Sequence, residues 1–257
     1  MNIDGIHIGE GSPCRFVFEV SNAHNGSFER ALRLIDAAKA CGADFVKFQC
    51  YTPDELVALR GDGPAPEPWG SQGFTMKSLY EKAQTPLAWF PALFQHARDI
   101  GIVPFSSVFG LESLALLERC ACPAYKIAAL DNGARSLSEA VASRNKPMLV
   151  SRRGFGKYGW RHPDEISLYC GEGYPTPSEN VHLPFFDMIH GSSYLGLSSH
   201  CLDPRLPIAA VARGCKLIEM HGMLREEPSE LEVNVSLDPF QFDQMIADVR
   251  ATEVLLA

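Results

Sequence analysis

The chain has 257 residues, 46% of them hydrophobic, and a formal net charge of −8, so it is long enough to bury a full core. No group of lysines and arginines is dense enough to follow a phosphate backbone, which argues against nucleic acid as a partner. The first residues have neither a basic start nor an apolar h-region, and no window reaches the roughly eighteen apolar residues of a membrane span. We therefore expect a soluble, cytoplasmic protein with no membrane partner.

Eight short apolar segments alternate along the chain with stretches of helical periodicity. Most are continuous rather than alternating in hydrophobicity, which is typical of parallel strands covered on both faces. The predicted strands are Arg15–Val20, Asp44–Gln49, Ile102–Ser107, Ala124–Ala129, Pro147–Arg152, Glu165–Cys170, Tyr194–Ser199 and Lys216–His221.

Amphipathic helices are predicted between these strands. The first begins after Ser27, a residue type that caps helices, and ends near Gly42. The same apolar spacing recurs in the segments 91–101 and 238–249. Eightfold alternation predicts a single (β/α)8 TIM barrel over residues 1–257. A doubly wound open sheet is the alternative, but no G-x-G-x-x-G turn follows the first strand.

Two connections depart from this regular pattern. The loop 60–73 is rich in glycine and proline and is longer than a minimal connection. The stretch between Ser151 and Cys170 is rich in glycine and aromatic residues, so we expect a shortened or irregular fifth helix there.

The eight cysteines are scattered along the chain. Cys120 and Cys122 are one residue too close for a zinc knuckle and have no second pair. We expect free structural thiols and a reducing compartment.

Polar side chains end or directly follow the predicted strands. Active sites of TIM barrels form at the carboxyl ends of the strands, so these residues should meet at one mouth. They are Glu19, Lys47, Gln49, Ser106, Ser107, Lys126, Ser151, Arg152, Tyr174, Ser198, His200, Glu219 and His221.

Two imidazoles and two ammonium groups stand out in this set. One strand-end histidine is more often structural than a ligand, but His200 and His221 on neighbouring strands also suit a divalent ion such as manganese, iron, cobalt or zinc. Lys47 and Lys126 lie among apolar neighbours, and each could extend to the rim as a solvated residue. Two lysines in one mouth nevertheless favour an anionic ligand.

At these residues the sequence resembles the N-acetylneuraminate (sialic acid) synthase family. The resemblance rests on IGEGSPCRFVFEVSNAHNG, LIDAAKACGADFVKFQ, PFSSVFGLESLALLE, CPAYKIAA, KPMLVS, YPTPSENVHL, LGLSSH and LIEMH, in this order along essentially the whole chain. It implies a barrel with an N-terminal hairpin, and an enzyme that condenses phosphoenolpyruvate with an N-acylated amino sugar to give a 2-keto sugar acid and phosphate. It also implies a divalent metal, commonly Mn²⁺, with Mg²⁺, Co²⁺ and Zn²⁺ as other candidates.

The resemblance also assigns roles to residues of this chain. It implies metal binding by His200 and His221, phosphoenolpyruvate binding by Lys47, Ser107, Lys126, Ser151 and Ser198, catalysis by Glu19 and Glu219, and acceptor binding by Gln49, Tyr174 and Glu232. Arg152 adds positive charge at the rim of the fifth strand, so it is a further candidate for acceptor binding, with a solvated arginine as the alternative.

The chain departs from the family at several positions. A serine after the Lys126 motif is Ala129, a glutamate two residues later is Asp131, and an asparagine near the phosphoenolpyruvate site is Glu172. Typical members add a C-terminal antifreeze-like domain that gives an arginine to the partner subunit's sugar and supports dimerisation. We expect the barrel domain alone here, and a homodimer stays an open expectation.

Three hypotheses follow from these observations. The first is a phosphoenolpyruvate-dependent synthase with a divergent acceptor. The others are a metal-dependent aldolase or lyase on the same barrel, and a catalytically silent binding barrel. The presence of both imidazoles and both lysines together favours the first.

Overall fold

Eight parallel strands form a closed sheet at the centre of the molecule. The computed structural model describes residues 1–131, 133–153, 162, 165–183 and 194–257. The strands of the sheet are β3 (Arg15–Glu19), β4 (Phe45–Cys50), β5 (Val103–Val108), β6 (Tyr125–Ile127), β7 (Met148–Arg153), β8 (Glu165–Cys170), β9 (Tyr194–Ser199) and β10 (Leu217–Gly222). Each strand pairs with the next along the chain, and β10 also pairs with β3, so the sheet is a barrel. This confirms the predicted fold and rules out the open sheet.

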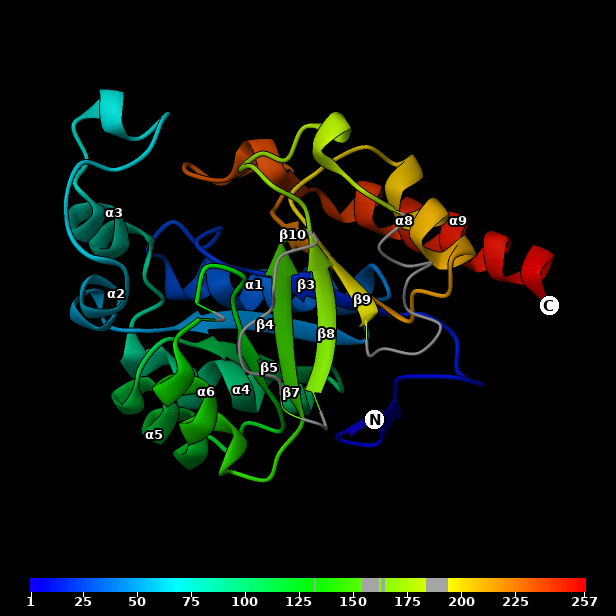
Figure 1. Cartoon of the computed structure of the whole chain (residues 1–257), viewed down its shortest axis with the longest axis horizontal. Helices are drawn as coiled ribbons and strands as arrows, with labels where there is room; N and C mark the ends of the chain where they lie inside the picture. Colours follow the sequence, from blue (N-terminus) through cyan, green and yellow to red (C-terminus); the bar gives the residue numbers. More distant parts are fainter. Residues whose placement is uncertain (132, 154–161, 163–164, 184–193) are drawn as a thin grey trace.

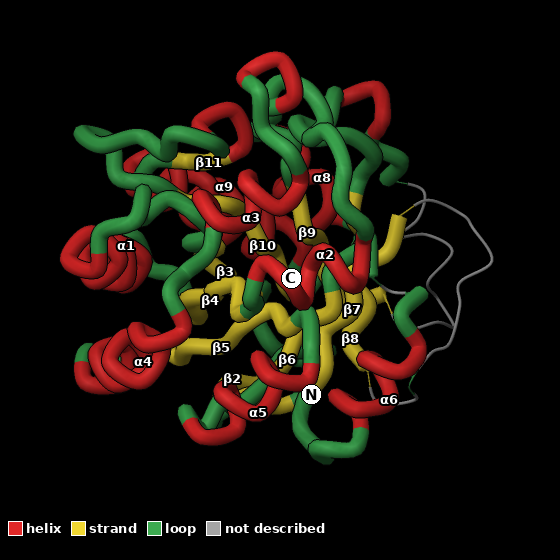
Figure 2. The backbone as a smooth tube through the Cα atoms, turned by 90° about the vertical axis from the view of Figure 1, so that its left-hand side faces the viewer, coloured by secondary structure: helices red, strands yellow, loops and turns green. Residues whose placement is uncertain are grey.

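Helices surround this barrel, as the tube view shows (Figure 2). The helix α1 begins at Phe28 after Ser27, whose hydroxyl accepts a hydrogen bond from the Arg30 N–H, as the sequence predicts. The helices are α1 (Phe28–Ala40), α2 (Pro53–Arg60), α3 (Met76–Ala83), α4 (Phe90–Asp99), α5 (Leu111–Arg119), α6 (Arg135–Ala142), α8 (Arg205–Ala212) and α9 (Pro239–Leu256). Among the described residues, none of these helices is long and apolar enough to cross a membrane.

A small hairpin precedes the barrel, as expected. Its strands β1 (Asn2–Ile3) and β2 (Ile6–His7) are antiparallel. The carbonyl of His7 accepts a hydrogen bond from the side chain of Arg15 at the start of β3. The hairpin therefore lies against the amino ends of the strands, opposite the predicted site (Figure 1). The expected irregular fifth helix falls largely on residues 154–161 and 163–164, outside those that the structure describes.

The register of the strands decides which side chains face the barrel interior. Residues that are partners in parallel strands lie side by side and share a face. His221 is the partner of Glu19, and Glu19 is the partner of Lys47. Ser107 is likewise the partner of Lys126, and Ser198 that of Glu219. The polar residues at the carboxyl ends therefore converge inside the barrel.

Apolar residues fill the barrel below these polar groups. Phe45 and Phe105 meet edge to face with ring centroids 5.8 Å apart. Gly196 permits close packing in the same interior, because a Cβ there would lie 2.4 Å from Leu168 Cδ2 and 2.7 Å from the Leu217 carbonyl oxygen. This packed layer keeps the mouth in a water-poor environment, where charges interact strongly.

Candidate active site

Lys47 is the centre of one half of a buried polar cluster in the mouth. It is 2% exposed, pairs with the Glu19 carboxylate and donates a hydrogen bond to Ser107 Oγ at 3.0 Å. The second carboxylate oxygen of Glu19 accepts a hydrogen bond from the Ser21 N–H at 2.9 Å. This half therefore joins β3, β4 and β5.

Lys126 is the centre of the other half. Its ammonium pairs with Glu219 and donates a hydrogen bond to Ser198 Oγ at 3.0 Å. The Ser198 hydroxyl donates in turn to Glu219 Oε1 at 3.0 Å, and Lys47 Nζ lies 3.6 Å from the same oxygen. Glu219 thus connects the two lysines across the barrel.

Burial and charge pairing oppose each other in this cluster. Burial alone would raise the pKa of Glu219, but Lys126 and Lys47 outweigh it and lower that pKa to about 2. Burial lowers the pKa of Lys126. Burial also acts to lower the pKa of Lys47, but Glu19 and Glu219 outweigh it, so that pKa is raised. The two lysines differ because Lys47 has a carboxylate of its own, whereas Lys126 shares Glu219.

His200 and His221 face each other beside this cluster, with ring centroids 5.2 Å apart. The ring of Tyr174, from the loop after β8, packs against both, with centroids 4.6 Å from His200 and 6.0 Å from His221. Burial, together with the charge of His221, lowers the pKa of His200 well below its ordinary value. His200 is therefore a neutral imidazole at neutral pH, which is the form that binds metals.

Glu232 orients the imidazole of His221. Its carboxylate lies 3.3 Å from His221 Nδ1 and accepts a hydrogen bond from the Tyr174 hydroxyl. Burial acts to lower the pKa of His221, but Glu232 outweighs it and raises that pKa. Burial acts to raise the pKa of Glu232, but His221 outweighs it and lowers that pKa to about 2. With Nδ1 facing the carboxylate, Nε2 is the nitrogen left for a ligand.

The two imidazoles are the protein groups that fit a metal ion here. Over the described part of the chain, no three side chains of His, Cys, Asp or Glu gather as a ligand set. A divalent ion at His200 and His221 would therefore complete its shell with water or substrate oxygen. The neutral ring of His200 and the carboxylate behind His221 are the features expected of such a pair.

Gln49 and Ser151 also lie in the mouth. Gln49 donates a hydrogen bond to Ser21 Oγ at 3.0 Å, next to Glu19. Ser151 is buried on β7, two residues beyond the partner of Lys126, so it shares the interior face.

Ser106 precedes Ser107 in β5, so it points to the opposite face, and its hydroxyl donates to the Phe48 carbonyl at 2.9 Å. The structure thus brings together the predicted site residues other than Ser106 and Arg152, and their individual roles stay predictions.

Arg152, which the sequence predicts to bind the acceptor, does not face the mouth. Arg152 follows Ser151 in a strand, so it points to the opposite face of the sheet. It is 1% exposed and pairs with Glu165 on β8, and its Nε donates to Ser167 Oγ at 3.3 Å. Arg152 therefore stabilises the outer face of the barrel wall.

This correction predicts that Arg152→Met destabilises the protein. The change leaves the Glu165 carboxylate buried without its cation, which should cost about 3 kcal/mol of unfolding free energy. Urea denaturation measures it, and Arg205→Met is the matched control, because Arg205 pairs with Asp203 but its side chain is 84% exposed. The control should unfold like the parent protein. A stable Arg152→Met variant with a weakened acceptor affinity would restore the original assignment.

Comparison with known proteins identifies the family. The model of the NeuB family matches residues 34–157 and 161–257, which is most of the chain. The chain belongs to the NeuB family. This confirms the resemblance to sialic acid synthases drawn from the motifs.

Named relatives agree with this membership. A pseudaminic acid synthase of Campylobacter jejuni is 33% identical over 93% of this chain and 74% of its own length. The human N-acetylneuraminate-9-phosphate synthase is 26% identical over 97% of this chain and 73% of its own length. A crystal structure of N-acetylneuraminic acid synthetase from Leptospira borgpetersenii, in complex with citrate, superposes with a TM-score of 0.85 at 22% identity. It covers 100% of this chain and 90% of that one, and at this identity it supports the fold alone.

Two residues near the mouth of this NeuB chain are absent from the predicted set. Arg60, at the end of α2, makes two parallel contacts with Asp131 at 2.8 and 2.6 Å. Trp69 packs against Tyr174 with ring centroids 5.9 Å apart. The unusual length of the loop 60–73 indicates that it could reach the mouth, and Trp69 lies in it. No sequence pattern points to Arg60, because its partner Asp131 is 71 residues away.

The departures from the family pattern also have a place in the structure. Asp131 is buried by its pair with Arg60, so it serves the connection between α2 and the segment after β6. Glu172 is exposed, and its backbone carbonyl accepts a hydrogen bond from Asn180. Its charge therefore lies outside the buried cluster of the mouth.

Proposed function

We propose that this NeuB-family chain condenses phosphoenolpyruvate with the aldehyde of an N-acylated amino sugar, giving a 2-keto sugar acid and inorganic phosphate. The observation that carries the proposal is the meeting of two buried lysines and two imidazoles in one barrel mouth. The printed names of the relatives, a pseudaminic acid synthase and an N-acetylneuraminate-9-phosphate synthase, support the same reaction class.

The lysines are proposed to bind the anionic groups of phosphoenolpyruvate. Lys47 and Lys126 would face its carboxylate and phosphate, with hydroxyl donors from Ser107, Ser151 and Ser198. A buried ammonium is an effective partner for phosphate because the surrounding dielectric is low.

The charge of the cluster supports a metal ion as a further component. Lys47 and Lys126 contribute +2, and Glu19, Glu219 and Glu232 contribute −3, so these groups carry no net positive charge even when His221, whose pKa is raised, is protonated. An anionic substrate therefore gains no net attraction from them unless positive charge is added. We propose a divalent ion, Mn²⁺ in the first place, on His200 and His221. When bound, such an ion supplies Lewis-acid polarisation of the aldehyde oxygen.

The carbon–carbon bond forms between C3 of phosphoenolpyruvate and the aldehyde carbon, whose oxygen takes up a proton. Water then adds at C2, and cleavage of the bond between C2 and the bridging oxygen releases phosphate and leaves the keto group. Glu19 and Glu219 are proposed to orient that water and accept its proton. Gln49, Tyr174 and Glu232 are proposed to hold the hydroxyl and amide groups of the acceptor.

Phosphate release tests this proposal. Purified protein is first stripped of metal with a chelator and then given Mn²⁺, phosphoenolpyruvate and N-acetylmannosamine or its 6-phosphate. We expect phosphate release that requires metal, phosphoenolpyruvate and sugar together. Metal binding without phosphoenolpyruvate binding in calorimetry would favour an aldolase or lyase. Binding of neither would favour a silent barrel.

A further inference from the structure

Arg153 is an interior residue at the mouth end of β7. It is the last residue of that strand, two positions after Ser151. Alternate residues of a strand share a face, so Arg153 points into the barrel with Ser151, whereas Arg152 points out of it. The register partner of Arg153 is Cys170 at the end of β8, and Cys170 Sγ lies 4.0 Å from Nδ1 of His200. Arg153 therefore belongs to the mouth.

Arg153 lies on the side of the mouth that also holds Lys126. Lys126 is on β6, which pairs with β7. Burial raises the pKa of Cys170, and the positive charges of Lys126 and Arg153 both act against that rise. The two cations therefore act on the same buried thiol and approach one part of the mouth from neighbouring strands.

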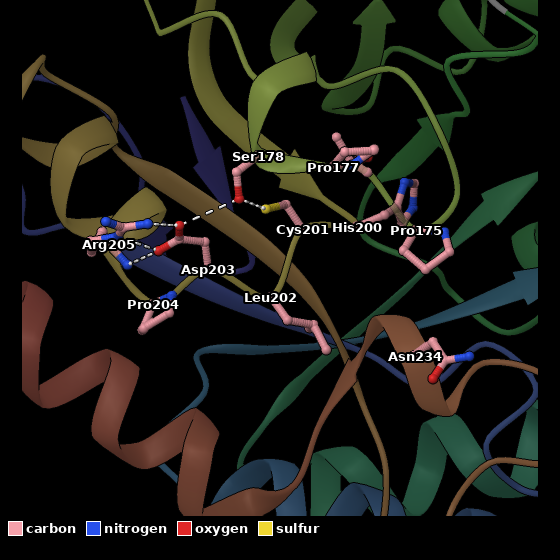
Figure 3. Close-up of a pocket in the computed structure, with 11 residues that line it drawn as sticks. Pro175, Pro177, Ser178, His200, Cys201, Leu202, Asp203, Pro204, Arg205 and Asn234 are labelled. Carbon is pink, nitrogen blue, oxygen red and sulfur yellow. Dashed lines mark hydrogen bonds and ion pairs between the residues drawn. The ribbon is translucent and has the colours of Figure 1, made fainter.

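Arg153 has no carboxylate partner among the residues that the structure describes, unlike three other arginines at this end of the barrel. Those three are each bound by a carboxylate: Arg60 by Asp131, Arg152 by Glu165 and Arg205 by Asp203. Figure 3 shows the Asp203–Arg205 pair in a cavity of about 630 Å³ that His200 also lines.

The guanidinium of Arg153 thus keeps hydrogen-bonding capacity for a ligand. Its Nε is buried and has no hydrogen-bond partner within the described part of the chain, although the residue as a whole is only half-buried. The Cys170 thiol beside it is at most a weak acceptor. A buried donor of this kind favours an anionic ligand, because leaving it unsatisfied costs free energy.

The balance of charge indicates which anionic group Arg153 would bind. Lys47 is paired with Glu19 and Lys126 with Glu219, so each ammonium is largely neutralised by its own carboxylate. A phosphate monoester carries about two negative charges at neutral pH, whereas a carboxylate carries one. A guanidinium can also contact two phosphate oxygens at once. The unpaired cation of the mouth should therefore attract a phosphate most strongly.

We propose that Arg153 binds the phosphate group of phosphoenolpyruvate, beside Lys126, and is the third cation of that substrate's site. This inference rests on the proposed function. It gives the two consecutive arginines of β7 different tasks, since Arg152 stabilises the barrel wall and Arg153 binds substrate.

Arg153→Met tests this role. Calorimetry on protein stripped of metal with a chelator measures the affinities for phosphoenolpyruvate and for inorganic phosphate. We expect both dissociation constants to rise about tenfold or more, because a charge-assisted contact to phosphate is lost. Arg153→Lys keeps the charge without the planar fork, so it should lose less affinity. Pyruvate, which has the carboxylate but no phosphate, should bind Arg153→Met as it binds the parent protein.

Two controls separate binding from folding. Arg205→Met should keep the parental affinities, because the side chain of Arg205 is 84% exposed and already bound by Asp203. Urea unfolding of Arg153→Met should stay near that of the parent protein, since no described carboxylate loses its cation. A loss of stability as large as the one expected for Arg152→Met would show a structural role for Arg153 and overturn the proposal.

The binding measurements can also contradict the role of Arg153 without touching the synthase reaction. Parental affinity for phosphoenolpyruvate and phosphate in Arg153→Met would overturn that role, and so would a selective loss of pyruvate affinity, which would put the guanidinium at the substrate carboxylate. If the parent protein binds inorganic phosphate through Arg153 but does not bind phosphoenolpyruvate, the phosphate site stands and the proposed function falls.

Discussion

Lys126→Met is expected to abolish turnover and to lower the free energy of unfolding by about 3 to 5 kcal/mol. Lys126 is 4% exposed and pairs with Glu219, which is equally buried. The uncharged methionine side chain leaves Glu219 with Lys47 alone, at 3.6 Å, and a buried carboxylate without its close partner is strongly destabilising. Thermal and urea unfolding measure the loss of stability, and phosphate release measures turnover.

The double variant Lys126→Met/Glu219→Gln separates the structural role of Lys126 from its binding role. Removing both charges together leaves no uncompensated ion, so most of the lost stability should return. Lys47 keeps its own pair with Glu19 in this variant. Phosphoenolpyruvate affinity should nevertheless stay at least about a hundredfold below that of the parent protein, because the second ammonium is still missing. A stable double variant that binds phosphoenolpyruvate like the parent would show that Lys126 serves only the fold.

The barrel could be predicted from sequence because its strands are continuous apolar segments with clear ends. Each predicted strand matches an observed one to within one or two residues at either end. The largest difference is at β6, which ends at Ile127 rather than at Ala129. There the chain turns away from the sheet, and the Asp131 N–H donates to the Ala128 carbonyl. The residue types in this turn do not predict that the strand ends at Ile127.

The site was predicted less completely than the fold. The sequence prediction puts Arg152 in the mouth together with Ser151, whereas consecutive strand residues point to opposite faces, so only Ser151 faces the interior. No such local rule predicts the pairs of Glu19 with Lys47 and of Glu219 with Lys126. These pairs depend on which strands become neighbours or face each other across the barrel. Lys126 and Glu219 are 93 residues apart, and no local pattern specifies their contact.

His200→Ala and His221→Ala are each expected to reduce turnover by roughly a thousandfold, which corresponds to about 4 kcal/mol of transition-state stabilisation. The rings face each other at 5.2 Å, and each is proposed to supply one metal ligand. Calorimetry with Mn²⁺ should therefore show weakened binding in both variants, while phosphoenolpyruvate affinity without metal should change little, since the lysines are intact.

Glu232→Gln is expected to weaken Mn²⁺ binding less than the two alanine variants do. Glu232 contacts Nδ1 of His221 and lies behind the proposed ligand nitrogen, so its loss should weaken Mn²⁺ binding by about 10- to 100-fold without removing a ligand. The amide keeps the shape of the side chain and can still accept a hydrogen bond from Tyr174. A series in which either alanine variant binds Mn²⁺ less tightly than Glu232→Gln would support a metal on the imidazole pair. Parental Mn²⁺ affinity in both alanine variants would place the ion elsewhere, and the acceptor aldehyde would then lose its proposed position between the rings and the lysines.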